Sequence, residues 1–120
     1  MPFNYLLTNL LVDVPGAVGA IFLDDEGEAV DWVTHHDDPY DLKVEGAYHS
    51  IFKRQLDDFA TLSNNGAVQS YMVQSARLVA LTQTLPEGYY VVLVLDRSSP
   101  RAQAMYHLRK AASVIARELA

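Results

Sequence analysis

The sequence predicts an α/β (α+β) domain built on a five-stranded antiparallel sheet with helices on both faces. Two short apolar runs, Ala17–Leu23 and Tyr89–Leu95, are bounded by turn residues and are typical of buried strands. Two longer segments, Asp41–Leu62 and Pro100–Leu119, repeat apolar residues at helical spacing. Short turn sequences between neighbouring strands favour hairpins, and therefore antiparallel pairing.

The N-terminal part of the chain predicts a helix followed by a hairpin. Apolar residues at helical spacing predict a helix over Pro2–Val12, which ends before Pro15 because proline disfavours the helical conformation of its predecessor. The run Ala17–Leu23 and the segment Glu28–Thr34 are the predicted hairpin strands. Gly27 suits the turn between them, since glycine readily takes the left-handed conformation of a tight turn.

The second predicted helix, Asp41–Leu62, is the longest element of the chain. Asp38 is a candidate cap and Pro39 fits a first helical turn. The segment would be about 33 Å long at about 1.5 Å per residue. Its apolar residues form one broad stripe, and Asn64–Gly66 is a typical helix end.

The C-terminal part predicts three strands and a last helix. The predicted strands are Ala67–Ser75, Arg77–Thr84 and Tyr89–Leu95, with Pro86–Gly88 as the turn before the third. The continuous apolar run is the best candidate for the central strand. Ser99 and Pro100 are start signals for the last helix, and the predicted element order is α-β-β-α-β-β-β-α.

Composition bounds the classes of function that remain. A chain of 120 residues has the size of one domain, so we expect a single domain over residues 1–120. The absence of cysteine excludes disulfides, thiolate zinc sites and a cysteine nucleophile. The net charge of −6 argues against a dedicated nucleic-acid binder. No apolar run approaches the length of a membrane helix and no signal peptide is evident, so we expect a cytoplasmic protein without membrane insertion.

The sequence offers little support for catalysis or for a cofactor. His35, His36, Asp37 and Asp38 resemble a metal cluster, but consecutive loop residues rarely converge on one ion, and a solvated loop that caps a helix is the favoured interpretation. No phosphate-binding or nucleophile motif occurs. Two-carboxylate catalysis remains an alternative, although no pair stands out. We expect no metal, no cofactor and no intrinsic enzyme activity.

Charge is unevenly distributed along the chain. Nine acids and one base lie between Asp24 and Glu45, whereas five bases and no acid lie between Arg97 and Arg117. A solvated surface with helix-end charges is the favoured interpretation, and orientation against a charged partner is the alternative. Nucleic-acid binding through the last helix is a less favoured alternative. Nothing in the sequence assigns Arg54, Arg97 or Arg101 the role of an arginine finger.

The element order and three stretches together resemble the Roadblock family (dynein light chain type), and within it the MglB-like regulators of Ras-like GTPases. The stretches are VPGAVGAIFLDDEGEAVDWV, YYVVLVLD and SSPRAQAMYHLRKAASVIARELA. The segment from His35 to Phe59 departs from the alanine- and leucine-rich second helix of the family. The resemblance spans most of the chain, from Val14 to Leu119.

The resemblance implies a non-catalytic dimeric scaffold that binds a Ras-like small GTPase or a signalling or motility complex. The third strands of two subunits would pair, with their second helices adjacent. The predicted homodimer interface comprises Tyr48, Phe52, Gln69, Ser70, Tyr71, Met72 and Val73. The predicted partner contacts, on the polar side of the second helix, are His49, Lys53, Arg54 and Asp57. The alternative is a homodimeric module that senses a small molecule, which a closed apolar pocket would favour.

Overall fold

The computed structural model describes residues 3–35, 40–64 and 66–119, and in the second helix it describes the side chains of residue 49 and residues 51–62. The predicted element order is confirmed. The elements are α1 (Asn4–Asp13), β1 (Ala17–Leu23), β2 (Ala29–Thr34), α2 (Tyr40–Leu62), β3 (Ser70–Gln74), β4 (Leu78–Thr84), the short 3-10 helix η1 (Pro86–Gly88), β5 (Tyr90–Asp96) and α3 (Arg101–Leu119).

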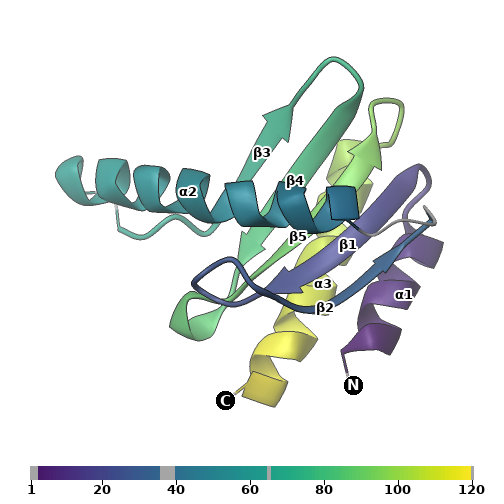
Figure 1. Ribbon diagram of the computed structural model, residues 1–120, viewed down its shortest axis with the longest axis horizontal. Coiled ribbons are helices and arrows are strands. Elements are labelled where there is room, and N and C mark those ends of the chain that lie inside the picture. Colours follow the sequence, from purple (N-terminus) through teal and green to yellow (C-terminus); the bar gives the residue numbers. More distant parts are fainter. Residues whose placement is uncertain (1–2, 36–39, 65, 120) are drawn as a thin grey trace.

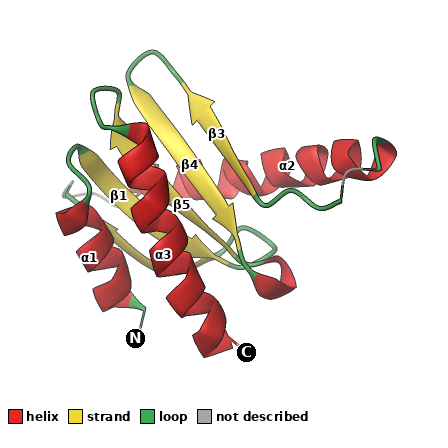
Figure 2. Cartoon of the chain, turned by 180° about the vertical axis from the view of Figure 1, so that it is seen from behind, coloured by secondary structure: helices red, strands yellow, loops and turns green. Residues whose placement is uncertain are grey.

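The strands form one antiparallel sheet in the order β2-β1-β5-β4-β3. The helices α1 and α3 lie side by side on one face, and α2 runs across the strands on the other (Figure 1, Figure 2). The predicted five-stranded antiparallel sheet with helices on both faces is therefore confirmed. Among the described strands, β2 and β3 are the two edges.

The core lies on both sides of the central strands because successive residues of β1 and β5 point to opposite faces. Phe22, Leu93 and Leu95 pack with α1 and α3, whereas Ile21 and Val92 belong to a smaller cluster on the opposite face. The prediction that the second apolar run is a central strand is confirmed, since β5 pairs with both β1 and β4.

A tight connection joins β5 to α3. The Asp96 carboxylate accepts hydrogen bonds of 2.9 Å from the backbone N–H and the hydroxyl of Ser98, and these bonds lower the pKa of Asp96. The hydroxyl of the buried Ser99 donates to the carbonyl of Pro15. The start of α3 is thereby held against the turn between α1 and β1.

The largest departure from the predicted boundaries is at β3, which begins at Ser70 rather than Ala67. The preceding backbone bonds to side chains instead: the Val68 N–H donates to the Asp57 carboxylate at 3.3 Å, and the Val68 carbonyl accepts from the Thr84 hydroxyl at 3.1 Å. These bonds hold the segment between α2 and β3 against α2 on one side and β4 on the other. The candidate cap Asp38, with Pro39, lies outside the described residues.

Candidate interaction surfaces

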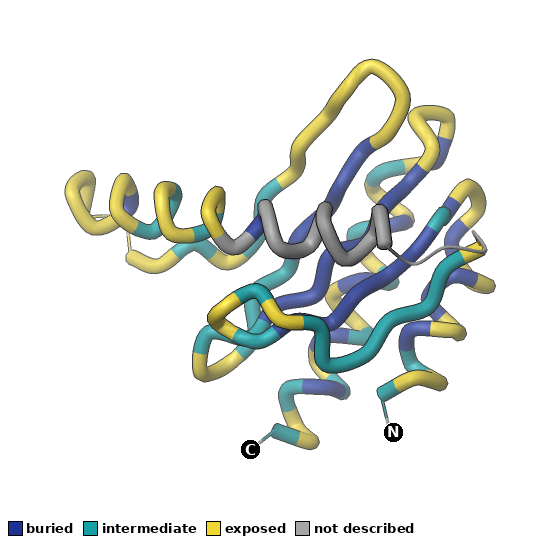
Figure 3. The backbone as a smooth tube through the Cα atoms, viewed as in Figure 1, coloured by how far each residue is buried: buried dark blue, intermediate teal, exposed yellow. Residues whose placement is uncertain are grey.

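The C-terminal half of α2 extends past β3, beyond the sheet that its first half crosses (Figure 1). This half carries large apolar side chains that no other described element covers: Phe59 is 68% exposed and Leu62 is 88% exposed. Ile51 and Phe52 are exposed as well, on the same broad side of the helix. Figure 3 shows this part of α2 as largely exposed. Exposed apolar side chains that gather on one surface indicate an interaction site.

The edge strand β3 lies beside this part of α2. The Thr84 N–H donates to the Gln69 carbonyl and the Ser75 N–H to the Leu78 carbonyl, each at 2.9 Å. Because hydrogen-bonding direction alternates along an antiparallel strand, the N–H groups of Ser70, Met72 and Gln74 point away from β4. The strand contains neither a charged residue nor proline, which commonly protect an edge from pairing.

A buried polar cluster connects α2 to the sheet, and it corrects one prediction. His49 is only 1% exposed, so its predicted place on the exposed polar side of the helix is wrong. Its Nδ1 lies 2.8 Å from the Tyr71 hydroxyl and 3.2 Å from the Thr82 hydroxyl. The Tyr71 hydroxyl also donates to the His49 carbonyl at 3.1 Å. The imidazole faces the sheet, where it forms hydrogen bonds with the hydroxyl groups of Tyr71 and Thr82.

The other predicted partner contacts differ in how freely they face solvent. Arg54 is exposed, as predicted. Lys53 is half-buried and pairs with Asp57 at 3.4 Å. Asp57 also accepts the Val68 N–H, so its carboxylate holds the connection between α2 and β3. Arg54 is therefore the best exposed charge of this set.

The predicted interface residues fall into two groups. Phe52, Met72 and Val73 are exposed on the described surface of α2 and β3, and Ser70 lies in the edge strand. Tyr71 is engaged within its own chain through His49, and the Gln69 carbonyl is engaged by β4. The side chain of Tyr48 lies outside the described residues. Whether this set forms a dimer interface stays a prediction.

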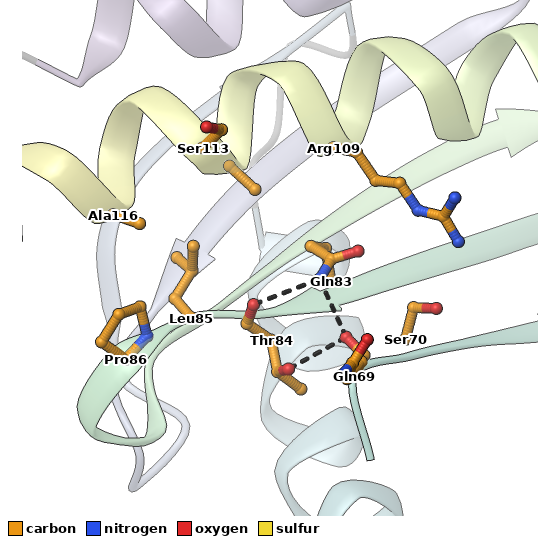
Figure 4. A pocket seen from close by; sticks show the side chains of 10 residues that line it. Gln69, Ser70, Gln83, Thr84, Leu85, Pro86, Arg109, Ser113 and Ala116 are labelled. Carbon is orange, nitrogen blue, oxygen red and sulfur yellow. Dashed lines mark hydrogen bonds between the residues drawn. The ribbon is translucent and has the colours of Figure 1, made fainter. Parts of the chain in front are cut away.

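A groove of about 490 Å³ lies on the opposite face of the sheet, between α3 and the ends of β3 and β4 (Figure 4). It is open at the surface and has a mixed lining. The lining residues are Gln69, Ser70, Gln83, Thr84, Leu85, Pro86, Arg109, Ala112, Ser113 and Ala116. The sequence pattern did not predict this groove; small residues at 112, 113 and 116 of α3 are the feature of the sequence that leaves room for it.

Neither a metal centre nor a membrane span is found in the described ranges. His, Asp and Glu side chains there form no group of three or more that would hold a metal ion. No helix in the same ranges is long and apolar enough to cross a membrane. His36, a member of the sequence cluster considered as a metal site, lies outside the described residues.

The fold is that of Roadblock/LC7 domains. The chain superposes on a Roadblock/LC7 domain from Streptomyces avermitilis with a TM-score of 0.88, covering 97% of this chain and 96% of that chain at 17% identity. It superposes on Myxococcus xanthus MglB with a TM-score of 0.89, covering 99% and 95% at 12% identity. An MglB solved in a tetrameric arrangement gives 0.85, covering 94% and 84% at 22% identity. No protein-family model and no curated protein matches the sequence.

Proposed function

We propose that this protein is a non-catalytic dimeric scaffold that binds and regulates a Ras-like small GTPase. The observation that carries the proposal is the exposed apolar end of α2 beside the unprotected edge strand β3. The structural likeness to MglB supports it. The sequence resemblance to MglB-like regulators supports it as well, since that resemblance implies a Ras-like GTPase as the partner.

A second copy of the chain fits the open edge of the sheet. Two β3 strands that pair antiparallel around a two-fold axis would each satisfy the outward backbone groups of the other. The same axis would bring the two α2 helices together and cover apolar surface that includes Phe59 and Leu62. Pairing and apolar burial thus require the same arrangement of subunits.

The dimer would present a surface that neither subunit has alone. Arg54 lies on the exposed polar side of α2 and is our leading partner contact. The switch loops of a Ras-like GTPase are ordered by the γ-phosphate of GTP. A partner recognised through those loops binds better in the GTP state than in the GDP state.

Titration calorimetry with candidate Ras-like GTPases tests the proposal. We expect tighter binding with a non-hydrolysable GTP analogue than with GDP, and weaker binding by the Arg54→Glu variant. Lys110→Glu, an equal charge change on an exposed residue of α3, is the matched control and should bind normally. Lack of binding to any candidate, with the dimer intact, would contradict the GTPase proposal. A monomer would contradict the dimer proposal separately.

The small-molecule sensor has no comparable support. It calls for a closed apolar pocket, whereas the groove in Figure 4 is open and lined by both polar and apolar side chains. A protein-binding function therefore remains the better account of the described surfaces.

A further inference from the structure

The groove between α3 and the ends of β3 and β4, called here the α3–β4 groove, has one wall held by several hydrogen bonds to a single carbonyl. The Gln69 carbonyl accepts from the Thr84 N–H at 2.9 Å, the Thr84 hydroxyl at 2.9 Å and the Gln83 side-chain amide at 3.0 Å. These bonds join the start of β3 to the end of β4. A wall that is already ordered loses little conformational freedom when a ligand binds.

The Gln83 side chain brings an acceptor to this wall. Its amide nitrogen donates to the carbonyls of Gln69 and Thr84, at 3.0 and 3.3 Å. A flipped amide would place oxygen against both carbonyls, so the orientation is determined by its neighbours. The Oε1 atom is then buried and has no hydrogen-bond partner among the described residues. A buried acceptor without a donor is costly, and a ligand N–H would remove that cost.

The other lining residues supply positive charge from α3 and apolar surface from both sides of the groove. Arg109 projects from α3 toward the side of the groove that carries Gln83 and Ser70 (Figure 4). None of the ten lining residues is acidic. Leu85, Pro86 and Ala116 add apolar surface at the other end of the groove (Figure 4). The groove therefore offers an anion contact, an unused acceptor and an apolar patch within one volume.

We propose that this groove binds an acidic peptide segment of a partner protein. A carboxylate of the peptide bonds to Arg109, a backbone N–H is directed to the Gln83 acceptor, and an aliphatic side chain packs on Leu85 and Pro86. Arg109 suits this role because guanidinium groups bind carboxylates with two parallel hydrogen bonds. The groove lies on the face of the sheet opposite α2, so the inference does not depend on the proposed GTPase contact.

A peptide fits these walls better than a nucleic acid does. A phosphate backbone is bound by several basic side chains in a row, whereas Arg109 is the one basic side chain among the groove's lining residues and the chain carries a net charge of −6. The amide and hydroxyl groups of the groove, beside the guanidinium of Arg109, match the N–H groups and carboxylates of an acidic peptide.

Fluorescence anisotropy with the whole protein tests the inference. The probe is a short fluorescein-labelled peptide of glutamate, leucine and glycine, and its control has glutamine in place of glutamate. We expect saturable binding of the acidic probe and a loss of about tenfold or more with Arg109→Gln, the scale of a charge-assisted pair. Lys110→Gln makes the same charge change on the next residue, outside the groove lining, and should alter the affinity less than about twofold.

Four results would overturn the inference. The first is no saturable binding up to about millimolar peptide, which is the weak end of specific affinity. The second is equal binding of the glutamine probe, and the third is an equal loss of affinity in the Arg109 and Lys110 variants. The fourth is preferential binding of a single-stranded RNA oligonucleotide or an anionic lipid vesicle through Arg109. Thermal melts of both variants check that each is folded. Arg109→Lys separates charge from geometry: retention of part of the affinity is the expected result, whereas unchanged affinity would contradict the paired hydrogen bonds to the guanidinium.

Discussion

The Tyr71 hydroxyl joins the edge strand β3 to the middle of α2. It donates to the His49 carbonyl and lies 2.8 Å from the His49 Nδ1. The imidazole and phenol rings are stacked with their centroids 5.6 Å apart. In the proposed dimer, both elements contribute to the subunit interface. A small change in this cluster would therefore alter how α2 is presented to a second subunit.

We predict that Tyr71→Phe lowers the free energy of unfolding by about 1–3 kcal/mol, because it removes the hydrogen bonds that the Tyr71 hydroxyl makes to the buried His49. Hydrogen exchange in the middle of α2 should also become faster. Tyr106→Phe on α3 is the matched control, since Tyr106 is 62% exposed and its loss of a hydroxyl should cost less than about 0.5 kcal/mol. Urea unfolding measures the stability of both variants, and equal stabilities of Tyr71→Phe and Tyr106→Phe would contradict the role of the cluster.

The turn that joins β4 to β5 packs against the turn that joins β1 to β2. Gly88 has a φ of +82°, and a side-chain Cβ placed there would lie 2.6 Å from the Cβ of Asp25. Gly66, after α2, has a similar φ of +84° but no atom within 4 Å of such a Cβ. The two glycines therefore share a backbone conformation and differ in their surroundings.

Alanine at these two positions separates backbone strain from packing. We predict that Gly66→Ala costs about 1 kcal/mol of unfolding free energy, from the left-handed conformation alone. Gly88→Ala should cost a further 1–3 kcal/mol or so, because the added methyl group displaces the Asp25 turn. Thermal or urea unfolding of the two variants measures the difference. Equal costs would mean that the two turns do not pack tightly in solution.

The elements that the sequence predicted well are those set by local patterns. The bounds of β1 and of the end of α2 agree with the prediction, because an apolar run and a helix-end signal are each contained in a few residues. The start of β3 was predicted too early, since side-chain bonds from Asp57 and Thr84 take its backbone away from strand pairing. No short pattern contains those partners.

The candidate sites were harder to predict for the same reason. The side of α2 that packs on the sheet depends on how the helix crosses the strands, so His49 was wrongly placed on the exposed side. Arg54 is exposed, as the helical pattern predicts, whereas the place of Phe52 in a dimer interface stays a prediction. The α3–β4 groove combines residues from β3, β4, η1 and α3, and only the fold brings them together.

The open edge of the whole sheet leads to a test of assembly. The Met72 N–H points away from β4, so Met72→Pro should leave the pairing with β4 intact and remove a hydrogen bond that a partner strand would accept. We predict a dimer for the unmodified chain and a folded monomer for Met72→Pro at tens of micromolar. Light scattering measures the mass, and circular dichroism checks the fold.

Val73→Pro is the control for this prediction. The Val73 N–H points to β4 within the same chain, so proline there should destabilise the fold itself rather than the assembly alone. A Met72→Pro variant that remains dimeric would place the subunit contact elsewhere. A monomeric unmodified chain would contradict strand pairing between subunits altogether.

The strand order also has a consequence for synthesis of the chain. The central pair joins Ala17 of β1 to Leu95 of β5, whereas every other pair joins strands that are consecutive in the chain. Closing such a distant pair costs more chain entropy and slows folding. During translation, the β1–β2 hairpin emerges well before β5, so the edge of β1 that pairs with β5 stays unpaired until β5 has been synthesised. Throughout that interval the apolar strand β1 is unpaired along one edge, and such transient exposure of an apolar strand favours aggregation or chaperone binding.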